Sequence, residues 1–144
     1  MSKSNVTEND VVKFFAHGTA MPSYGGTLYQ HLHTGDPGEA GTSATNECDY
    51  DDYARVAVDR SVTGFTICDA DGTPNASGSA FKNAADVTFP ECNISFVGIQ
   101  TATHSSLCTA SGQILYKGAL STPIVVAALN TPRIVAGGSI YKEN

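Results

Sequence analysis

Short apolar or alternating segments, each bounded by Gly, Pro, Ser or Asn, constrain the fold of this chain more than any other feature. Such segments favour short β-strands separated by turns. They occupy residues 27–34, 53–60, 63–68, 86–90, 94–101, 113–120, 123–129 and 133–141. No long helical pattern lies between them, which favours antiparallel pairing over βαβ units. We therefore expect one mainly-β fold, with residues 19–144 forming a single antiparallel β-sandwich or jelly-roll-like domain.

One helix is expected, near the start of the chain, over TENDVVKFFAH at residues 7–17. Thr7 and Asp10 have the spacing of a capping box, and Gly18 can adopt the left-handed conformation that ends helices. Its apolar stripe consists of Val11, Val12, Phe14 and Phe15. We expect this stripe to pack on the sheet of the same chain, with docking on a neighbouring subunit as the alternative. Residues 1–18 are thus predicted to be an N-terminal arm with a short helix.

The charge balance limits the partners. The formal net charge is −6 and the sequence pI is about 4.9, which disfavours nucleic acid and anionic membranes as partners. The longest apolar run, PIVVAAL, is too short to span a bilayer. The first ten residues contain no apolar core of a secretion signal. We therefore expect a soluble protein that is made in a cytosol.

The four cysteines do not have metal-site spacing. They lie at positions 48, 68, 92 and 108, without a CxxC pair or a Cys/His cluster, so no zinc site is predicted. Synthesis in a cytoplasm favours buried free thiols, with two disulfides as the alternative.

Other candidate chemistry is weak. His31 and His33 project from one face of a strand, but no third metal ligand accompanies them, so we expect a polar strand face. Asp69 and Asp71 lie in a segment that has neither the Gly nor the Glu spacing of a calcium loop, and Asp71-Gly72 reads as a hairpin turn. No nucleophile motif or phosphate-binding loop is present. We expect no metal, no cofactor and no enzymatic activity.

Four blocks of sequence follow one another along the chain: HTGDPGEAGT at 33–42, YAR at 53–55, NAADVTFP at 83–90 and LYKGALSTP at 115–123. Together they resemble a family of small virion structural proteins from tailed bacteriophages. Their order and spacing run from about residue 22 to residue 140. The chain departs from the family pattern in having no Trp and in the region 92–100, so we expect different local packing there.

The resemblance implies a virion component described either as a head decoration (cement) protein or as part of a tail fibre. We expect a cement protein that binds the outside of the capsid as an oligomer, because the chain is small and contains no heptads or repeats of a fibre shaft. Its partners would be the major capsid protein and copies of itself. The alternative is a tail-fibre or adhesin domain that contacts tail proteins or host glycan. A glycan surface would draw on Tyr24, Tyr29, Tyr50 and Tyr53.

The candidate contact residues lie in two regions. The segment DPGE at residues 36–39, here called the DPGE loop, combines a stiff turn with two carboxylates that can meet Arg or Lys on a partner. The alternative is that this loop only connects two strands. Arg55, predicted on an outward strand face beside Tyr53, could pair with the loop carboxylates of the same chain. The full candidate set is Asp36, Pro37, Gly38, Glu39 and Arg55, with Phe14 and Phe15 on the arm.

Overall fold

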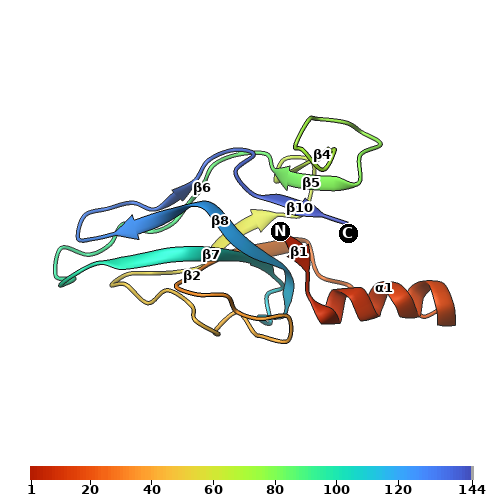
Figure 1. Cartoon of the computed structure of the whole chain (residues 1–144), viewed down its shortest axis with the longest axis horizontal. Coiled ribbons are helices and arrows are strands. Elements are labelled where there is room, and N and C mark those ends of the chain that lie inside the picture. The colour runs from red at the N-terminus through yellow and green to blue at the C-terminus, as the bar shows by residue number, and fades with distance from the viewer. Residues whose placement is uncertain (144) are drawn as a thin grey trace.

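The computed structural model describes residues 1–143 and shows a mainly-β, sandwich-like protein with antiparallel sheets and a short N-terminal helix, as predicted (Figure 1). The strands in chain order are β1 (Ser2–Lys3), β2 (Thr27–His33), β3 (Val56–Asp59), β4 (Phe65–Cys68), β5 (Ala80–Asn83), β6 (Val87–Thr88), β7 (Gln100–Cys108), β8 (Ile114–Val126), β9 (Arg133–Ile134) and β10 (Ile140–Lys142). The helix α1 spans Asn5–His17. Within the described residues, no helix is long and apolar enough to cross a membrane.

Five strands form the main sheet, in the order β1-β8-β7-β2-β3, with all neighbours antiparallel. A three-stranded sheet, β10-β5-β4, and a two-stranded sheet, β6-β9, complete the fold. Two clusters of buried apolar side chains join the main sheet to the smaller ones. Leu28 of β2 packs in a cluster with Tyr141 of β10, and Leu32 of β2 packs in a second cluster with Ile134 of β9. The core therefore lies between the main sheet and the two small sheets.

The central strand β7 was not predicted except for its first two residues. Residues 94–99 were predicted to begin a strand, but they form a turn and an open loop, and β7 begins at Gln100. β7 contains hydroxyl and imidazole side chains, so it lacks the apolar pattern of a strand. It is nevertheless buried because β2 and β8 pair with it on both sides.

Two segments predicted to be separate strands form the single strand β8 (Ile114–Val126). Pro123 lies inside it, next to a register shift in the pairing with β7, between Ala102 and His104. A proline is tolerated in a strand at such an irregularity because its missing N–H removes no regular ladder bond. Pro123 therefore indicates an irregularity within β8 and not the end of a strand.

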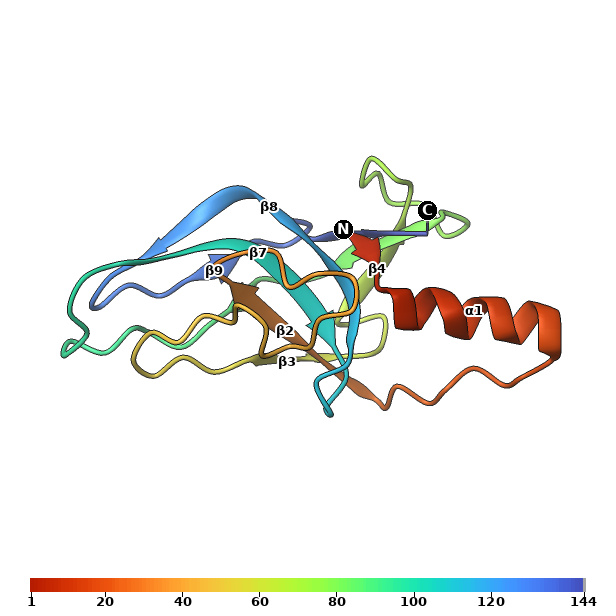
Figure 2. The ribbon, with the colours of Figure 1, turned by 60° about the horizontal axis from the view of Figure 1, so that its bottom comes forward.

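The helix begins earlier than predicted. Its N-cap is Ser4, whose hydroxyl accepts a hydrogen bond from the backbone N–H of Thr7. The predicted capping box at Thr7 is therefore wrong. The C-terminal prediction is confirmed, since Gly18 has φ 65° and its N–H bonds to the carbonyl of Lys13. From its start beside β1, the helix projects outward along the longest axis of the molecule (Figures 1 and 2).

All four cysteines are buried and have free thiols in this structure. Burial raises the pKa of the Cys48 thiol to about 12, with a smaller contribution from Asp49. A thiol in that state is a poor nucleophile. The cysteines therefore contribute to packing.

Candidate interaction surfaces

The first turn of α1 is fixed to the main sheet by buried hydrogen bonds. The Ser4 hydroxyl donates to the carbonyl of Ile114 at 2.6 Å, and the Thr7 hydroxyl donates to the carbonyl of Leu115 at 3.2 Å. The Tyr24 hydroxyl donates to the Asp10 carboxylate at 3.0 Å. These contacts fix the direction in which the helix leaves the body.

The distal half of α1 has few contacts with the rest of the chain. Phe15 is 80% exposed and Val12 is 60% exposed, while Phe14 is 45% exposed and touches Phe15 edge-on. The expectation that the apolar stripe packs on the sheet of the same chain is therefore wrong for Val12, Phe14 and Phe15, whereas Val11 is half-buried and lines a hollow with Leu28 and Tyr116. The hydrogen bonds at the start of the helix hold its axis pointing away from the sheet, so only the first turns can reach it. Phe14 and Phe15 as partner contacts stay a prediction.

The DPGE loop has the stiff geometry that its composition predicts. Gly38 has φ 79°, and its N–H donates to Asp36 Oδ1 at 2.8 Å. A methyl group on Gly41 would lie 1.7 Å from the carbonyl oxygen of Pro37, so this position accepts glycine only. The carbonyl of Glu39 accepts a bond from the N–H of Asn5, the first residue of α1. The loop therefore lies beside the start of the helix.

Both carboxylates of the DPGE loop bind the ammonium of Lys117 on β8. Lys117 Nζ lies 2.9 Å from Asp36 Oδ1 and 3.0 Å from Glu39 Oε1. The Lys117 side chain is only 10% exposed, whereas the two acids are about half exposed. The predicted ion pair with Arg55 is wrong, because Arg55 donates instead to the carbonyl of Ala110. The acids thus meet a cation of their own chain, and their role toward a partner stays a prediction.

The ion pairs alter the titration of this cluster. The hydrogen bond from Lys117 lowers the pKa of Asp36, with a further contribution from the Gly38 N–H. Burial acts to lower the pKa of Lys117, but the bonds to Asp36 and Glu39 outweigh it and the pKa is raised. Asp36 and Lys117 are therefore both charged near neutral pH.

His31 and His33 are buried instead of forming an exposed polar face. Their exposed fractions are 2% and 0%. His31 Nδ1 lies 2.6 Å from Glu47 Oε1, and His33 Nε2 lies 2.7 Å from the hydroxyl of Ser106. His33 Nδ1 also lies 2.9 Å from the carbonyl of Thr45. The prediction of a surface pair is wrong, because the loop that carries Thr45 and Glu47 covers this face of β2.

Within residues 1–143, no group of three His, Cys, Asp or Glu is placed to hold a metal ion. The segment that resembled a calcium loop is a turn closed by its own side chains. Asp71 Oδ1 accepts a bond from the N–H of Thr73, and Asp69 Oδ1 accepts one from the amide of Asn75. Gly72 has φ 89°, which confirms the predicted turn at Asp71-Gly72.

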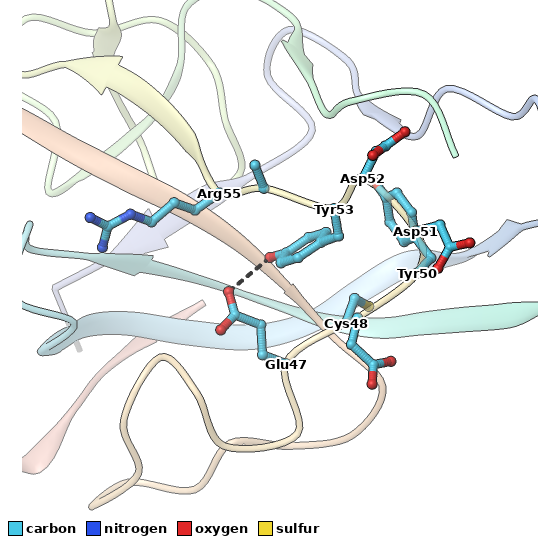
Figure 3. Close-up of a pocket in the computed structure, with 9 residues that line it drawn as sticks. Glu47, Cys48, Tyr50, Asp51, Asp52, Tyr53 and Arg55 are labelled. Atoms are coloured by element: carbon cyan, nitrogen blue, oxygen red, sulfur yellow. Dashed lines mark hydrogen bonds between the residues drawn. The ribbon is translucent and has the colours of Figure 1, made fainter. Parts of the chain in front are cut away.

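Residues 47–55 line an open depression of about 620 Å³ (Figure 3). Figure 3 shows Tyr53 pointing toward Glu47, with which its hydroxyl forms a 3.1 Å hydrogen bond. Asp51 and Asp52 are exposed at the opposite side of the depression. The depression thus has an acidic side, formed by Asp51 and Asp52, and a side where Tyr53 and Glu47 already form a hydrogen bond with each other.

The four tyrosines named for a glycan surface do not share one. Tyr50 is 1% exposed and its hydroxyl donates to the carbonyl of Pro90. Tyr53 was predicted to face outward, but it packs against the same core cluster. The guanidinium of Arg55 covers the ring of Tyr29 at 4.1 Å. Since two of the four rings belong to the core, this surface was wrongly predicted.

Two features of these surfaces were missed in the sequence. Lys117 lies in the block LYKGAL, where it resembles an ordinary solvent-facing position of a strand. Only the register of β8 shows that it faces the DPGE loop. The exposed apolar residues of 94–99 were missed because their pattern was taken for a buried strand. The local sequence of residues 94–99 does not indicate that they form a loop.

A mainly-β body with a projecting apolar helix end, and with acids engaged in fixing a loop, is typical of a structural protein. Comparison with protein families supports this class. The model of the family described as podophage GP4 fiber I protein gp80 matches residues 2–141. The match covers nearly the whole chain, so the protein belongs to this phage fibre family. No curated protein matches the chain. The expected role as a phage structural protein is thereby confirmed at this level.

Proposed function

We propose that this protein is a non-enzymatic component of a podophage tail fibre. The family description names a fibre, so it supports the tail-fibre alternative better than the expected capsid decoration. The role is mechanical: a stiff β body joins neighbouring virion proteins through the end of its N-terminal helix.

The projecting helix is the observation that carries this proposal. Its first turn is fixed by Ser4 and Thr7 on β8, while Phe15 extends into solvent at 80% exposure. Exposed aromatic side chains on a rigid element are typical anchors of protein–protein interfaces. A linking element placed at one end of a long molecule suits a fibre built from units in series.

Labelling of the virion tests the proposal. Antibodies raised against the purified protein are bound to intact phage particles and located by electron microscopy, with particles that lack the protein as the control. Label confined to the fibres supports the proposal. Label spread over the head would contradict it and favour the capsid decoration.

A further inference from the structure

Exposed apolar side chains gather at the two opposite ends of this molecule. Thirteen large hydrophobic residues are exposed within the described chain. Five belong to α1 and the segment after it: Val6, Val12, Phe14, Phe15 and Met21. Five others lie in or next to the connections from β6 to β7 and from β8 to β9: Ile94, Val97, Ile99, Val125 and Leu129. Figures 1 and 2 show α1 at one end of the long axis and these connections at the other.

The distal half of α1 needs a covering partner. An isolated helix of 13 residues is marginal in water, and packing of its apolar face supplies most of the stability of such a helix. Here the contacts with the body come from the first half of the helix, through Thr7, Asp10 and the half-buried Val11. Phe15, further along, meets only Phe14 among the aromatic residues. A second molecule can supply the missing contacts.

The connections at the other end form a connected surface. The N–H of Leu129 donates to the carbonyl of Cys92 at 2.8 Å, which joins the two connections. Val97 is 93% exposed and Ile94 is 73% exposed. The amide of Asn93 bonds to the Asp52 carboxylate at 2.8 Å, so the acidic segment 47–53 lies beside them. We call Ile94, Val97, Ile99 and Leu129 the far-end patch.

The two ends have opposite charge. Residues 11–18 of the helix end contain Lys13 and no acid. The segments that form the other end, 47–53, 91–100 and 125–131, contain five carboxylates and no Lys or Arg. Four of these carboxylates are exposed: Asp49, Asp51, Asp52 and Glu91. Such complementarity favours contact between unlike ends and disfavours pairing of two helix ends, which would bring Lys13 close to its own copy.

We propose that copies of this chain associate head to tail, with the distal half of α1 of one copy seated on the far-end patch of the next. Phe15 and Val12 supply the apolar contact, and Lys13 faces the carboxylates beside the patch. Because the two surfaces differ, the contact is heterologous, and it generates a ring or a linear series of copies. This inference deepens the proposed fibre role and names the partner as a second copy.

Two blocked variants test the arrangement in the full chain. F14Q/F15Q removes the aromatic anchors and keeps good helix formers in α1. V97S/I99S removes the centre of the far-end patch. V62S is the matched control, since Val62 is 90% exposed but lies in the turn between β3 and β4. Circular dichroism and the unfolding midpoint establish that each variant is folded.

Sedimentation velocity over concentrations up to about 1 mM measures self-association, since weak interfaces are populated there. We expect the wild type and V62S to associate equally, and each blocked variant to associate at least about tenfold more weakly, because each loses buried apolar side chains. A mixture of F14Q/F15Q with V97S/I99S should form dimers and stop there. Each dimer then uses the intact helix of one variant and the intact patch of the other.

Several outcomes would overturn the inference. A wild type that stays monomeric throughout the series does so, and so does a mixture that forms no dimers while the wild type associates. Association of V97S/I99S alone as strong as that of the wild type also overturns it, and would indicate helix-to-helix pairing, because that variant keeps its helix intact. The fibre role fails separately: antibody label on the head contradicts it even if the copies associate, and label on the fibre supports it even if they do not.

Discussion

Removing the acids of the DPGE loop should destabilise the protein more than removing the lysine that they bind. Lys117 Nζ makes ion pairs with Asp36 and Glu39 at 2.9 Å and 3.0 Å. The three side chains differ in burial, because the lysine is 10% exposed and the acids are 54% and 46% exposed. The two perturbations therefore leave different groups without a partner.

The magnitudes follow from this asymmetry. A hydrogen bond to a charged group contributes about 1.5–3 kcal/mol to stability. Because the two acids are half exposed to water, the contribution of each ion pair falls to about 1 kcal/mol. D36N/E39Q leaves the buried ammonium of Lys117 without a carboxylate, so we expect a loss of about 2–3 kcal/mol. K117M removes the same ion pairs, but it leaves an apolar side chain in a buried position and two carboxylates in water. Its expected cost is about 1 kcal/mol or less.

Urea unfolding of the wild type, D36N/E39Q, K117M and the triple variant measures these values. We expect the triple variant to resemble K117M, because no buried charge remains in either. Asn at position 36 can still accept the bond from the Gly38 N–H, so the turn itself is preserved in D36N. If K117M proves as destabilising as D36N/E39Q, the explanation from the buried ammonium is refuted.

Three further predictions concern the core and the turns. Burial lowers the pKa of His33 below its unfolded value of about 6.5, so the free energy of unfolding should fall as the pH drops below that value, by up to about 2 kcal/mol at pH 5. Urea unfolding midpoints at neutral pH and at pH 5 measure this fall. The control is H33Q, in which the fall should be smaller. G41A should cost about 1–3 kcal/mol because its methyl group would overlap the carbonyl of Pro37, whereas G26A, with open space around it, should change the midpoint little. The four buried thiols should resist a thiol reagent in the native protein and react completely in denaturant; fewer than four reactive thiols would indicate a disulfide.

The sequence was most informative where local chemistry decides the structure. The turn at Asp71-Gly72 and the helix end at Gly18 were both predicted from the conformational freedom of glycine and the capping ability of short side chains. Both are present. The alternation of residues 27–33 also predicted β2 correctly, because the side chains of a strand point to its two faces in turn and one face of β2 meets the core.

The predictions failed where distant segments decide the structure. β7 is polar but central, because β2 and β8 cover its edges. His31 and His33 looked like surface residues, yet a loop more than ten residues away covers them. Lys117 took the place assigned to Arg55 because the register of β8 places it beside the DPGE loop, and register across a sheet is not encoded by either segment alone.

The distribution of polar and apolar residues connects the fold to the proposed assembly. The interior contains hydrogen-bonded polar groups: Gln30 and Ser106, for example, are 1% and 0% exposed. Many of these polar side chains find a partner inside, as His33 does with Ser106, although His31 Nε2, Gln113 Nε2 and Ser139 Oγ have none within the described residues. Eight of the thirteen exposed large hydrophobic residues then belong to the distal half of α1 or lie in or next to the connections at the other end of the long axis. A monomer would gain from placing them inside, whereas a unit that associates end to end needs them at its two ends. The cost of an exposed Phe15 is offset only when a second molecule covers it.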